Sequence, residues 1–442
     1  CAAVALARSG QRVLVLEQHY LPGGWTQSFT LEQYRFSPGV HYIGDLHEGG
    51  GVRRVLEGLG VTRDLEFCEL NPDGYDHVIV GGERFDVPAG FDNYLARLVE
   101  RFPAEREGLE TYFRTLRAVT ADVQRCEKLL SFPAVLTVPF RAPSLVRHAF
   151  ARLEPLLDRT IRDPLLRGIL TAPCGNHGLA PSRVSIPPHA VMVEHYFNGG
   201  YYPRGGAKAI PSALIKELRR RGGKIRTRAR VSQILVENGR AAGVVMSDGE
   251  RIESEFVVSN ADPAVTYGRL LGDRADERER RRASRMEYSV SMISLFCAVD
   301  LDLRAIGLDS GNYWWFRSRD VGGIYERMER ELPKDEVEGL FVTATTLKNP
   351  EEYRGHHTLE IFTYVPYAPF AQWRGEQGAR GDDYDVVKRA LADKLLRAAE
   401  NVVPGLRGAL RFLEIGTPVT NEFYCEAHRG AALGTAKTPF QL

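Results

Sequence analysis

The chain is patterned by short apolar runs and longer amphipathic stretches, and the most informative run lies near its beginning. Residues 13–16 are apolar and the acidic Glu17 follows, which predicts a buried parallel strand with a carboxylate at its carboxyl end. The Ala-rich residues 1–9 precede Gly10, and this composition predicts the end of a helix. Together these elements favour the second half of a dinucleotide-binding βαβ unit, although many other α/β sheets contain such a strand. We expect the first strand and the glycine-rich loop of that unit upstream of residue 1.

Similar patterning predicts elements along the rest of the chain. Helices are predicted at 51–60, 91–102, 106–130, 188–197, 207–221 and 384–399. Glycine-containing pairs predict hairpin turns between short strands at 75–80 and 83–87, 231–237 and 241–246, and 241–246 and 251–254. Residues 256–261 predict another buried strand that ends in small polar residues. Longer strands at 291–299, 312–316, 339–346, 358–365 and 411–416 predict a second, mostly antiparallel sheet, and an aromatic loop is expected at 416–434.

Composition narrows the possible functions. The 442 residues carry a formal charge of +1, which gives no indication of bulk nucleic-acid binding. The six cysteines are scattered without metal-ligand spacing, which favours a reducing, cytoplasmic location over a disulfide framework. Cys174 and His177 share a loop but lack a partner at ligand spacing, so no metal site is predicted. No apolar run reaches the length of a membrane span.

Two further stretches carry open interpretations. Gly39 and Gly44 bracket a short apolar-aromatic segment, which indicates either close approach of the backbone to a flat ligand or an ordinary tight turn. Residues 126–157 mix apolar side chains and prolines with Arg141, Arg147 and Arg152. This composition is typical of a surface that lies on a membrane, or of a helical cap over a pocket.

Six short sequence motifs occur one after another along the chain. They are Glu17 with Pro22-Gly23-Gly24, residues 39–41, residues 203–206, residues 222–244, residues 257–263 and residues 416–421. In these motifs the chain resembles the flavin-dependent phytoene desaturase, carotenoid isomerase and retinol saturase family, within the wider amine-oxidase-like and GDI-like FAD group. It is most similar to the retinol saturase members. The family's glycine-rich loop and its carboxy-terminal flavin-contacting segment are absent from these residues, and we expect the latter beyond Leu442.

The resemblance implies an α/β fold with a Rossmann-like FAD-binding domain and a second, substrate domain of mixed or antiparallel sheet plus helices. It divides the chain into residues 1–74 and 196–282 for the FAD-binding domain and residues 75–195 and 283–411 for the substrate domain. Residues 412–442 would return toward the FAD-binding domain.

The resemblance also implies the FAD contacts. Glu17 would bind the adenosine ribose, and Val231 would hold the adenine through its backbone. The remaining implied contacts lie along the pyrophosphate, the ribityl chain and the flavin or close the site at a strand end: Gly23, Gly24, Thr26, Gly39, Val40, His41, Asn260 and Ala261.

The implied chemistry asks little of acid–base side chains, because the flavin itself transfers the hydride. His41 and Tyr42 are the candidate proton donors, and the alternative is that both only pack against the flavin ring. Tyr202 and Arg204 are the candidate substrate-pocket residues.

The implied function is that of an FAD-dependent oxidoreductase acting on carbon–carbon double bonds of a hydrophobic polyene or isoprenoid, by saturation, desaturation or isomerisation. NAD(P)H is a candidate electron donor, and a peripheral membrane surface is a candidate partner. The alternatives are a non-enzymatic prenyl-lipid carrier on the same scaffold and a flavin amine oxidase. Glu17 and the Gly23-Gly24 pair favour the enzyme, because a lipid carrier has no ribose to hold.

Overall fold

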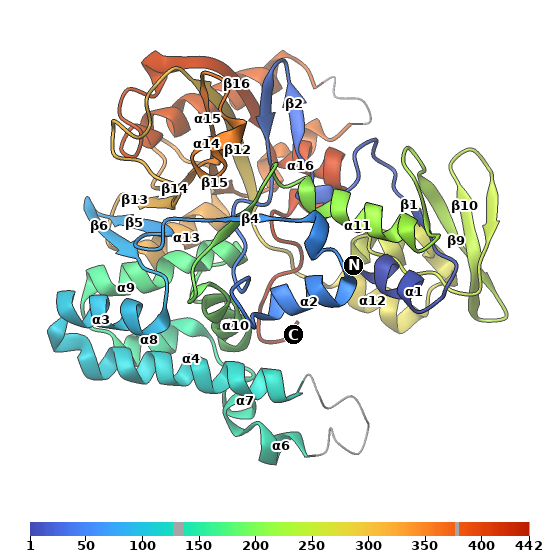
Figure 1. The fold of residues 1–442 in the computed structure, drawn as a ribbon, viewed down its shortest axis with the longest axis horizontal. Helices are drawn as coiled ribbons and strands as arrows, with labels where there is room; N and C mark the ends of the chain where they lie inside the picture. The colour runs from blue at the N-terminus through green and yellow to red at the C-terminus, as the bar shows by residue number, and fades with distance from the viewer. Residues whose placement is uncertain (127–136, 376–379, 442) are drawn as a thin grey trace.

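The structure is a computed structural model that describes residues 1–126, 137–375 and 380–441 (Figure 1). Its centre is a seven-stranded sheet, which we call the large sheet, with the strand order β16-β12-β15-β14-β13-β5-β6. Every neighbouring pair is antiparallel except β13 and β5, which are parallel. The strands are β5 (Asp76–Val80), β6 (Glu83–Val87), β12 (Ser291–Val299), β13 (Asn312–Phe316), β14 (Gly339–Ala344), β15 (His357–Val365) and β16 (Leu410–Gly416).

Helices cover both faces of the large sheet, so its central strands are buried throughout. One face packs against α15 (Asp382–Ala399) through a cluster that includes Leu295 and Ile361. The opposite face contributes Phe316 and Phe341 to a second core cluster, shared with a helical layer. That layer comprises α3 (Phe91–Arg101), α4 (Arg106–Cys126), α8 (Leu153–Thr160), α9 (Pro164–Thr171), α10 (Ile186–Tyr196) and α13 (Val321–Arg330). Alternate side chains of each strand therefore serve two separate cores.

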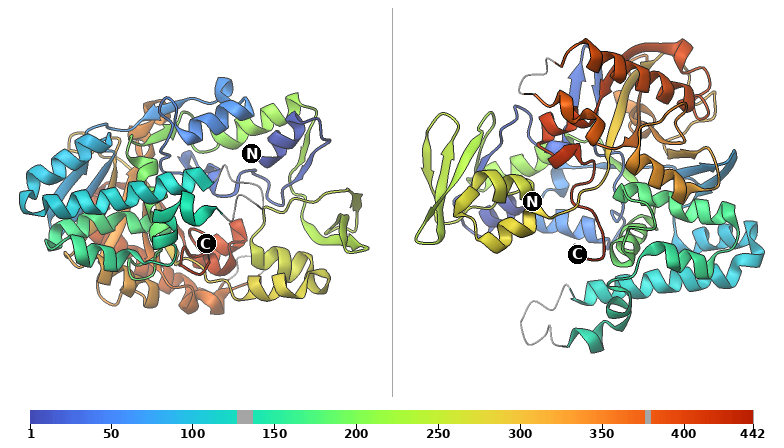
Figure 2. Two further views of the ribbon diagram at one scale, coloured as in Figure 1. Left: turned by 90° about the horizontal axis from the view of Figure 1, so that it is seen from below. Right: turned by 180° about the vertical axis from the view of Figure 1, so that it is seen from behind.

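A second region of the molecule is built around only two strands. Strand β1 (Leu14–Leu16) pairs in parallel with β8 (Lys224–Arg226), and we call this pair the small sheet. Helices α1 (Ala2–Arg8), α2 (Gly51–Leu59) and α11 (Ala209–Arg220) form a small core beside it. A three-stranded sheet of β9 (Val231–Glu237), β10 (Arg240–Met246) and β11 (Arg251–Glu253) extends to the edge of the molecule, as Figure 2 shows from behind.

Shorter elements connect these regions. Two small ladders join β2 (Phe29–Leu31) to β3 (Tyr34–Phe36) and β4 (Phe67–Glu69) to β7 (Tyr201–Pro203). The short helices are α6 (Val138–Arg141), α7 (Pro143–His148), α12 (Glu277–Ser284), α14 (Thr345–Lys348) and α16 (Pro418–Cys425), and η5 (Ala264–Leu270) is π-helical. The 3-10 turns are η1 (Gly24–Thr26), η2 (Thr62–Asp64), η3 (Pro103–Glu105), η4 (Ala172–His177), η6 (Gly272–Arg274), η7 (Pro350–Glu352), η8 (Ala368–Trp373), η9 (Arg407–Ala409) and η10 (His428–Gly430).

The predicted fold class is confirmed: the chain is an α/β fold with a parallel strand pair and a separate, mostly antiparallel sheet. The strand predicted at residues 13–16 is observed as β1 and ends at Leu16 as expected, and Gly10 follows α1 with a φ of 87°. The predicted hairpins at Gly81-Gly82 and Asn238-Gly239 both form. Part of the predicted helix 106–130 and of the stretch 126–157 lies outside the described residues.

Three sequence predictions are wrong in whole or in part. Residues 256–261 form no strand, and the side chains of Phe256 and Val258 are 80% and 66% exposed. An apolar run becomes a buried strand only beside a hydrogen-bonding neighbour, and no described strand pairs with this one. The predicted loop 416–434 contains helix α16, because Thr417 and Thr420 form a capping box at the amino end of this helix. The strand predicted over 339–346 also ends early, at Ala344, where α14 begins.

Candidate functional site

The end of β1 positions the carboxylate of Glu17. The Glu17 backbone N–H donates to the carbonyl of Arg226 at 2.9 Å, which extends the β1–β8 ladder by one residue. Its side-chain Oε1 accepts from the backbone N–H of His19 at 2.8 Å, so the chain turns around the carboxylate. Glu17 is only partly buried. The carboxyl end of the small sheet thus presents an oriented acceptor, as binding of a ribose requires.

The glycine pair that follows has the geometry of a tight cradle. Gly23 and Gly24 have φ angles of 124° and 56°, and a Cβ at Gly24 would meet nothing within 4 Å. A Cβ at Gly23 would lie 2.9 Å from Oγ1 of Thr26, whose hydroxyl donates to the Gly23 carbonyl at 2.7 Å. Nearby, the buried Oε1 of Gln27 has no hydrogen-bond partner among the described residues. Bare backbone, an oriented carboxylate and an unpartnered buried oxygen fit a sugar–phosphate chain.

The other implied nucleotide contacts are distributed unevenly. Val231 packs in the same small hydrophobic cluster as Leu16, so the start of β9 lies beside the end of β1. Asn260 and Ala261 are exposed and follow the irregular segment 256–261. The next residue, Asp262, accepts from the Tyr288 hydroxyl at 2.6 Å. The structure therefore brings Val231 to Glu17 through packing and leaves Asn260 and Ala261 on the surface.

Protein neighbours, rather than a ligand, account for Gly39 and Gly44. A Cβ at Gly39 would lie 2.7 Å from the Trp25 carbonyl oxygen, and one at Gly44 would lie 2.0 Å from that of His195. Both are closer than real Cβ atoms come, so the chain needs glycine at each position. Crowding by the chain itself is therefore enough to require both glycines, and the predicted contact of Gly39 with the flavin stays a prediction.

A buried polar network lies against the segment between these glycines. The ammonium of Lys348, at the end of α14, donates to the His41 carbonyl and to Oδ1 of Asn312, both at 2.5 Å. Asn312 Nδ2 donates in turn to Oδ1 of Asp76 at 3.0 Å, and the Tyr42 hydroxyl donates to Oδ2 of Asp76 at 3.0 Å. We call Tyr42, Asp76, Asn312 and Lys348 the lysine network. It ties the predicted flavin-facing segment to strands β5 and β13.

His41 and Tyr202 flank the lysine network. Nδ1 of His41 lies 3.0 Å from Oε2 of Glu360, without the alignment of a hydrogen bond. The other carboxylate oxygen of Glu360 accepts from the backbone N–H of Ser37. Ser37 also receives the hydroxyl of the fully buried Tyr202 at 3.1 Å. The candidate residues His41, Tyr42 and Tyr202 are therefore brought together on one side of β14 and β15.

Arg204 lies apart from this cluster. Its guanidinium is 44% exposed and forms ion pairs with the carboxylates of Glu66, at 3.1 Å, and Glu351. These partners are surface carboxylates, so Arg204 contacts no member of the lysine network in the described structure. Its assignment to a substrate pocket stays a prediction.

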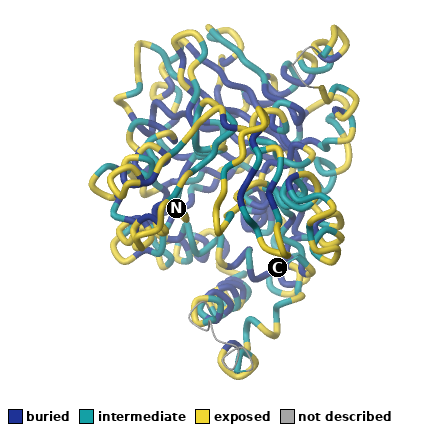
Figure 3. The backbone as a smooth tube through the Cα atoms, turned by 90° about the vertical axis from the view of Figure 1, so that its right-hand side faces the viewer, coloured by how far each residue is buried: buried dark blue, intermediate teal, exposed yellow. Residues whose placement is uncertain are grey.

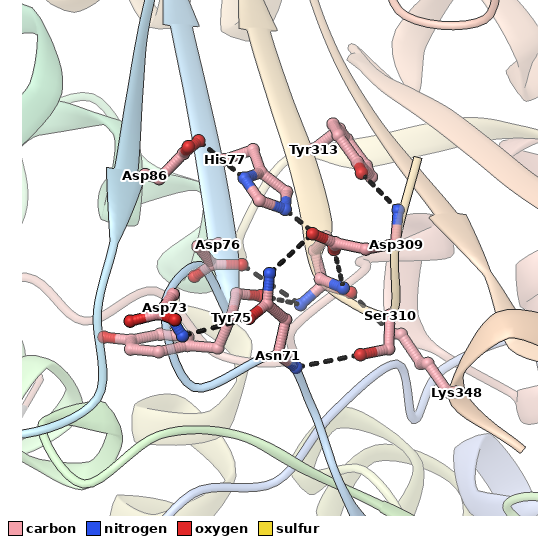
Figure 4. Close-up of polar contacts among 12 residues, drawn as sticks. Asn71, Asp73, Tyr75, Asp76, His77, Asp86, Asp309, Ser310, Tyr313 and Lys348 are labelled. Atoms are coloured by element: carbon pink, nitrogen blue, oxygen red, sulfur yellow. Dashed lines mark hydrogen bonds and ion pairs between the residues drawn. The ribbon is translucent and has the colours of Figure 1, made fainter. Parts of the chain in front are cut away.

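Next to Asp76 on β5, the buried His77 points to the opposite side. Its Nδ1 lies 2.6 Å from Oδ1 of Asp86, and its Nε2 lies 2.9 Å from Oδ1 of Asp309 (Figure 4). Burial alone would lower the pKa of His77, but the hydrogen bonds that its ring makes to Asp309 and Asp86 outweigh burial and raise the pKa. The imidazole between two carboxylates thus ties the β5–β6 hairpin to the loop before β13.

The electrostatics of the lysine network are set by burial. Burial raises the pKa of Asp76 to about 6, although hydrogen bonds from Asn312 and Tyr42 oppose that rise. Burial lowers the pKa of Lys348 to about 7, against the attraction of Glu360 and Asp76. Burial and the nearby Asp76 carboxylate raise the pKa of Tyr42 well above its usual range. Two groups that are normally fully charged at neutral pH therefore titrate near it.

One signal for these residues is visible in the sequence. Glu360 is a lone acid inside an apolar strand, and Asp76 and Asn312 begin strands that are otherwise apolar or aromatic. Polar residues at buried strand positions point to a network or a site. Which of them meet is set by the β13–β5 pairing, which puts Asn312 opposite Asp76.

No group of three or more His, Cys, Asp or Glu side chains in residues 1–126, 137–375 and 380–441 is arranged to hold a metal ion. The six cysteines are free thiols. Over the same described ranges, no helix has the length and apolar character needed to cross a bilayer.

The fold and the acidic end of β1 define a two-domain α/β flavoprotein. Residues 1–300 match the family described as flavin containing amine oxidoreductase, and the chain belongs to this family. It is therefore an oxidoreductase with a flavin cofactor.

Individual relatives refine the comparison. The chain is 28% identical to all-trans-retinol 13,14-reductase of Rattus norvegicus, over 98% of this chain and 75% of that protein. It is 25% identical to chloroplastic prolycopene isomerase 1 of an Oncidium hybrid cultivar, over 97% of this chain and 72% of the relative. The resemblance to the retinol saturase and carotenoid isomerase family is confirmed. A crystal structure of an oxidoreductase from Methanosarcina mazei shares the fold, with a TM-score of 0.62, 18% identity and coverage of 99% of this chain and 96% of that one.

Proposed function

We propose that this flavoprotein uses FAD and transfers hydride to or from carbon–carbon double bonds of a hydrophobic polyene. The observation that carries the proposal is the oriented Glu17 carboxylate beside the open backbone of Gly24, which suits a ribose and a pyrophosphate. Relatives named for reduction of retinol and isomerisation of prolycopene, similar over nearly the whole chain, support a polyene as the substrate. When bound, FAD supplies the hydride chemistry.

In this proposal the chain's own residues bind and orient. Glu17 holds the adenosine ribose, and the backbone of Val231 holds the adenine. The backbone of Gly23 and Gly24 lies along the pyrophosphate. Further contacts to FAD come from Thr26, Gly39, Val40, His41, Asn260 and Ala261. We assign residues 1–74 and 196–282 to FAD binding, residues 75–195 and 283–411 to the substrate, and residues 412–442 to a return toward the FAD-binding region.

Flavin uptake tests the proposal against the prenyl-lipid carrier. The purified full-length protein, incubated with FAD and freed of excess by gel filtration, should retain flavin absorption bands. A matched sample incubated with FMN should retain less, because FMN has no adenosine ribose for Glu17. A protein that retains neither flavin supports the carrier instead. NAD(P)H is our candidate electron donor, and anaerobic bleaching of the bound flavin by NADPH or NADH checks it.

We also propose that the molecule contacts an anionic membrane surface through its outer helices α6 and α7, which lie beyond the end of α4 (Figure 1). The side chains of Phe140 and Phe150 are 87% and 70% exposed, and that of Phe440, which stacks on Phe150, is 82% exposed. Arg141, Arg147 and Arg152 are exposed on the same stretch. Exposed aromatics beside arginines suit the headgroup region of a bilayer.

Vesicle binding tests this surface. Each arginine near an anionic bilayer contributes about 1 kcal/mol, so reversing all three should remove most binding. Co-sedimentation of the wild type with vesicles containing phosphatidylserine should exceed that of the triple Arg→Glu variant at 141, 147 and 152. A control variant that reverses the exposed Arg278, Arg281 and Arg282 of α12 should sediment like the wild type. Equal sedimentation of all three proteins would contradict the proposal.

A further inference from the structure

The hydrogen bonds of the lysine network have a fixed direction. Oδ1 of Asn312 accepts from the Lys348 ammonium at 2.5 Å and from the Thr343 hydroxyl at 3.1 Å. Because two donors occupy this oxygen, the amide nitrogen must face Asp76, and it donates to Oδ1 of Asp76 at 3.0 Å. The second oxygen of Asp76 is then the acceptor of the Tyr42 hydroxyl. The proton between Tyr42 and Asp76 is thus positioned by Lys348, through one amide.

One end of the network is closed and the other is accessible. The Lys348 side chain is 2% exposed, and its ammonium lies 5.9 Å and 5.6 Å from the ring centres of Tyr42 and Tyr202. Asp76, by contrast, is partly exposed, as is Tyr196, whose ring stacks on that of Tyr42 at 4.4 Å. From solvent, a proton can therefore reach the network at Asp76, and not at the buried Lys348.

The charged and titratable groups around Lys348 and Asp76 come from several elements. The Lys348 ammonium faces the carboxylates of Asp76 on β5 and Glu360 on β15. The groups that hydrogen-bond to Asp76 or interact with it electrostatically are Tyr42, Lys348, His77, Asn312 and the phenols of Tyr75, Tyr94 and Tyr196. Asn176 Nδ2, from the turn η4, donates to the Tyr42 oxygen at 3.2 Å. Among the described residues, Lys348 and His77 are the cations that act on Asp76, and His77 is held by its own two carboxylates.

We propose that Tyr42 and Asp76 form a proton-transfer couple for the reacting double bond and that Lys348 is the residue that positions it. This inference rests on the proposed function. In reduction, one carbon of the double bond accepts a hydride from reduced flavin. The π electron pair forms a C–H bond at the other carbon with the proton of the Tyr42 hydroxyl. For this step Asp76 is protonated: its carboxyl hydrogen takes over the hydrogen bond to the Tyr42 oxygen, leaves the phenol hydrogen free for the substrate, and moves onto that oxygen as the phenol proton departs. Asp76 then regains a proton from solvent, and desaturation runs the same steps in reverse.

The first test needs neither flavin nor substrate. Protein labelled with ¹³C at the aspartate carboxyl carbon is titrated by NMR, and the signal lost in Asp76→Asn assigns Asp76. An opposite charge close to a carboxyl lowers its pKa by about 1–3 units, so Lys348→Met should raise the Asp76 midpoint by about one unit or more. Lys348→Arg should restore part of that shift, and the distant Lys388→Met, on α15, should leave the midpoint unchanged. An unchanged midpoint in a folded Lys348→Met protein overturns the coupling.

The second test uses the flavin-loaded enzyme and does not depend on Lys348→Met folding. General acid–base catalysis contributes about 10²–10⁴-fold, so Tyr42→Phe and Asp76→Asn should each lower kcat by about 100-fold or more while flavin is retained. The pH profile of kcat in the wild type should also lose one limb in Asp76→Asn. Turnover that is unchanged in both variants overturns this inference alone. A wild type that binds flavin and turns over no polyene overturns the proposed function instead.

Discussion

The small sheet and the large sheet differ in strand length and in burial. The small sheet has two short strands, and the side chain of Leu14 in β1 is 39% exposed. The large sheet has strands of up to nine residues that are buried on both faces. Figure 3 shows this contrast as dark, buried backbone through the middle of the molecule and pale, exposed backbone at its periphery. In the proposed function the small sheet presents its backbone and one carboxylate to FAD, whereas the large sheet encloses the charged groups of the lysine network.

The two sheets bring their functional groups together in different ways. At the small sheet the working groups come from residues 17–27, which are adjacent in sequence and need only a turn to meet. At the large sheet Tyr42, Asp76, Asn312 and Lys348 come from four distant segments and meet only through strand pairing. Local groups can bind a ligand at an exposed edge, whereas burial in a deep core is what moves the pKa values of Asp76 and Lys348 toward neutrality.

Truncating one side chain in each sheet should give the largest difference, because the two side chains contribute unequally to the free energy of unfolding. Phe316 on β13 is 1% exposed and packs edge-on against Tyr325 of α13 at 5.5 Å. Phe316→Ala should therefore lower the free energy of unfolding by about 3–5 kcal/mol. Leu14→Ala in the small sheet should cost much less, since that side chain remains partly in water. Urea unfolding of both variants checks the contrast, and equal costs would show that the two sheets are equally buried in solution.

The next effect concerns FAD affinity. A hydrogen bond to a charged group is worth about 1.5–3 kcal/mol, so Glu17→Ala should weaken FAD binding by about 10- to 150-fold. The matched control is Glu237→Ala, because Glu237 also ends a strand and its side chain is 65% exposed. Equilibrium titration of flavin fluorescence measures both variants. Equal affinities of the two would mean that the end of β1 does not hold the ribose.

The smallest effect is expected at a buried carboxylate behind the small sheet. Glu217 on α11 has no exposed side-chain surface and forms ion pairs with four arginines: Arg8, Arg63, Arg220 and Arg221. The hydrogen bond from Arg221, aided by that from Arg63, lowers the pKa of Glu217 to about 2. The arginines themselves reach solvent, which screens the ion pairs and keeps their contribution modest.

The pH dependence of this contribution follows from the direction of the shift. Because the folded pKa lies below the unfolded value of about 4.3, the stabilisation is complete above that value and is lost as pH falls toward 2. Glu217→Gln should thus be less stable than the wild type at pH 7, with the difference disappearing near pH 2. Thermal melts across this range measure it. A difference that persists unchanged at low pH would rule out the charge as its source.

Features specified by local residues could be predicted from the sequence, whereas features that depend on distant contacts could not. The Glu17 strand end and the Gly23-Gly24 turn were predictable because local residue types specify them. Residues 256–261 looked like a buried strand because apolar composition says nothing about whether a neighbouring strand is present. Lys348 carried no local signal at all, since its role depends on contacts with His41 and Asn312, far away in the sequence.

The central claim is that bound flavin exchanges hydride with a polyene double bond, and one anaerobic mixing experiment tests it most directly. The FAD-loaded protein is reduced, freed of excess reductant, and mixed with all-trans-retinol in detergent micelles while absorbance is recorded. We expect the oxidised flavin bands to return together with a matching loss of the long-wavelength polyene absorption. Flavin that stays reduced until oxygen is admitted, with the absorption of the polyene unchanged, would contradict this expectation for this retinoid, and the same result with carotenoid polyenes would contradict the central claim.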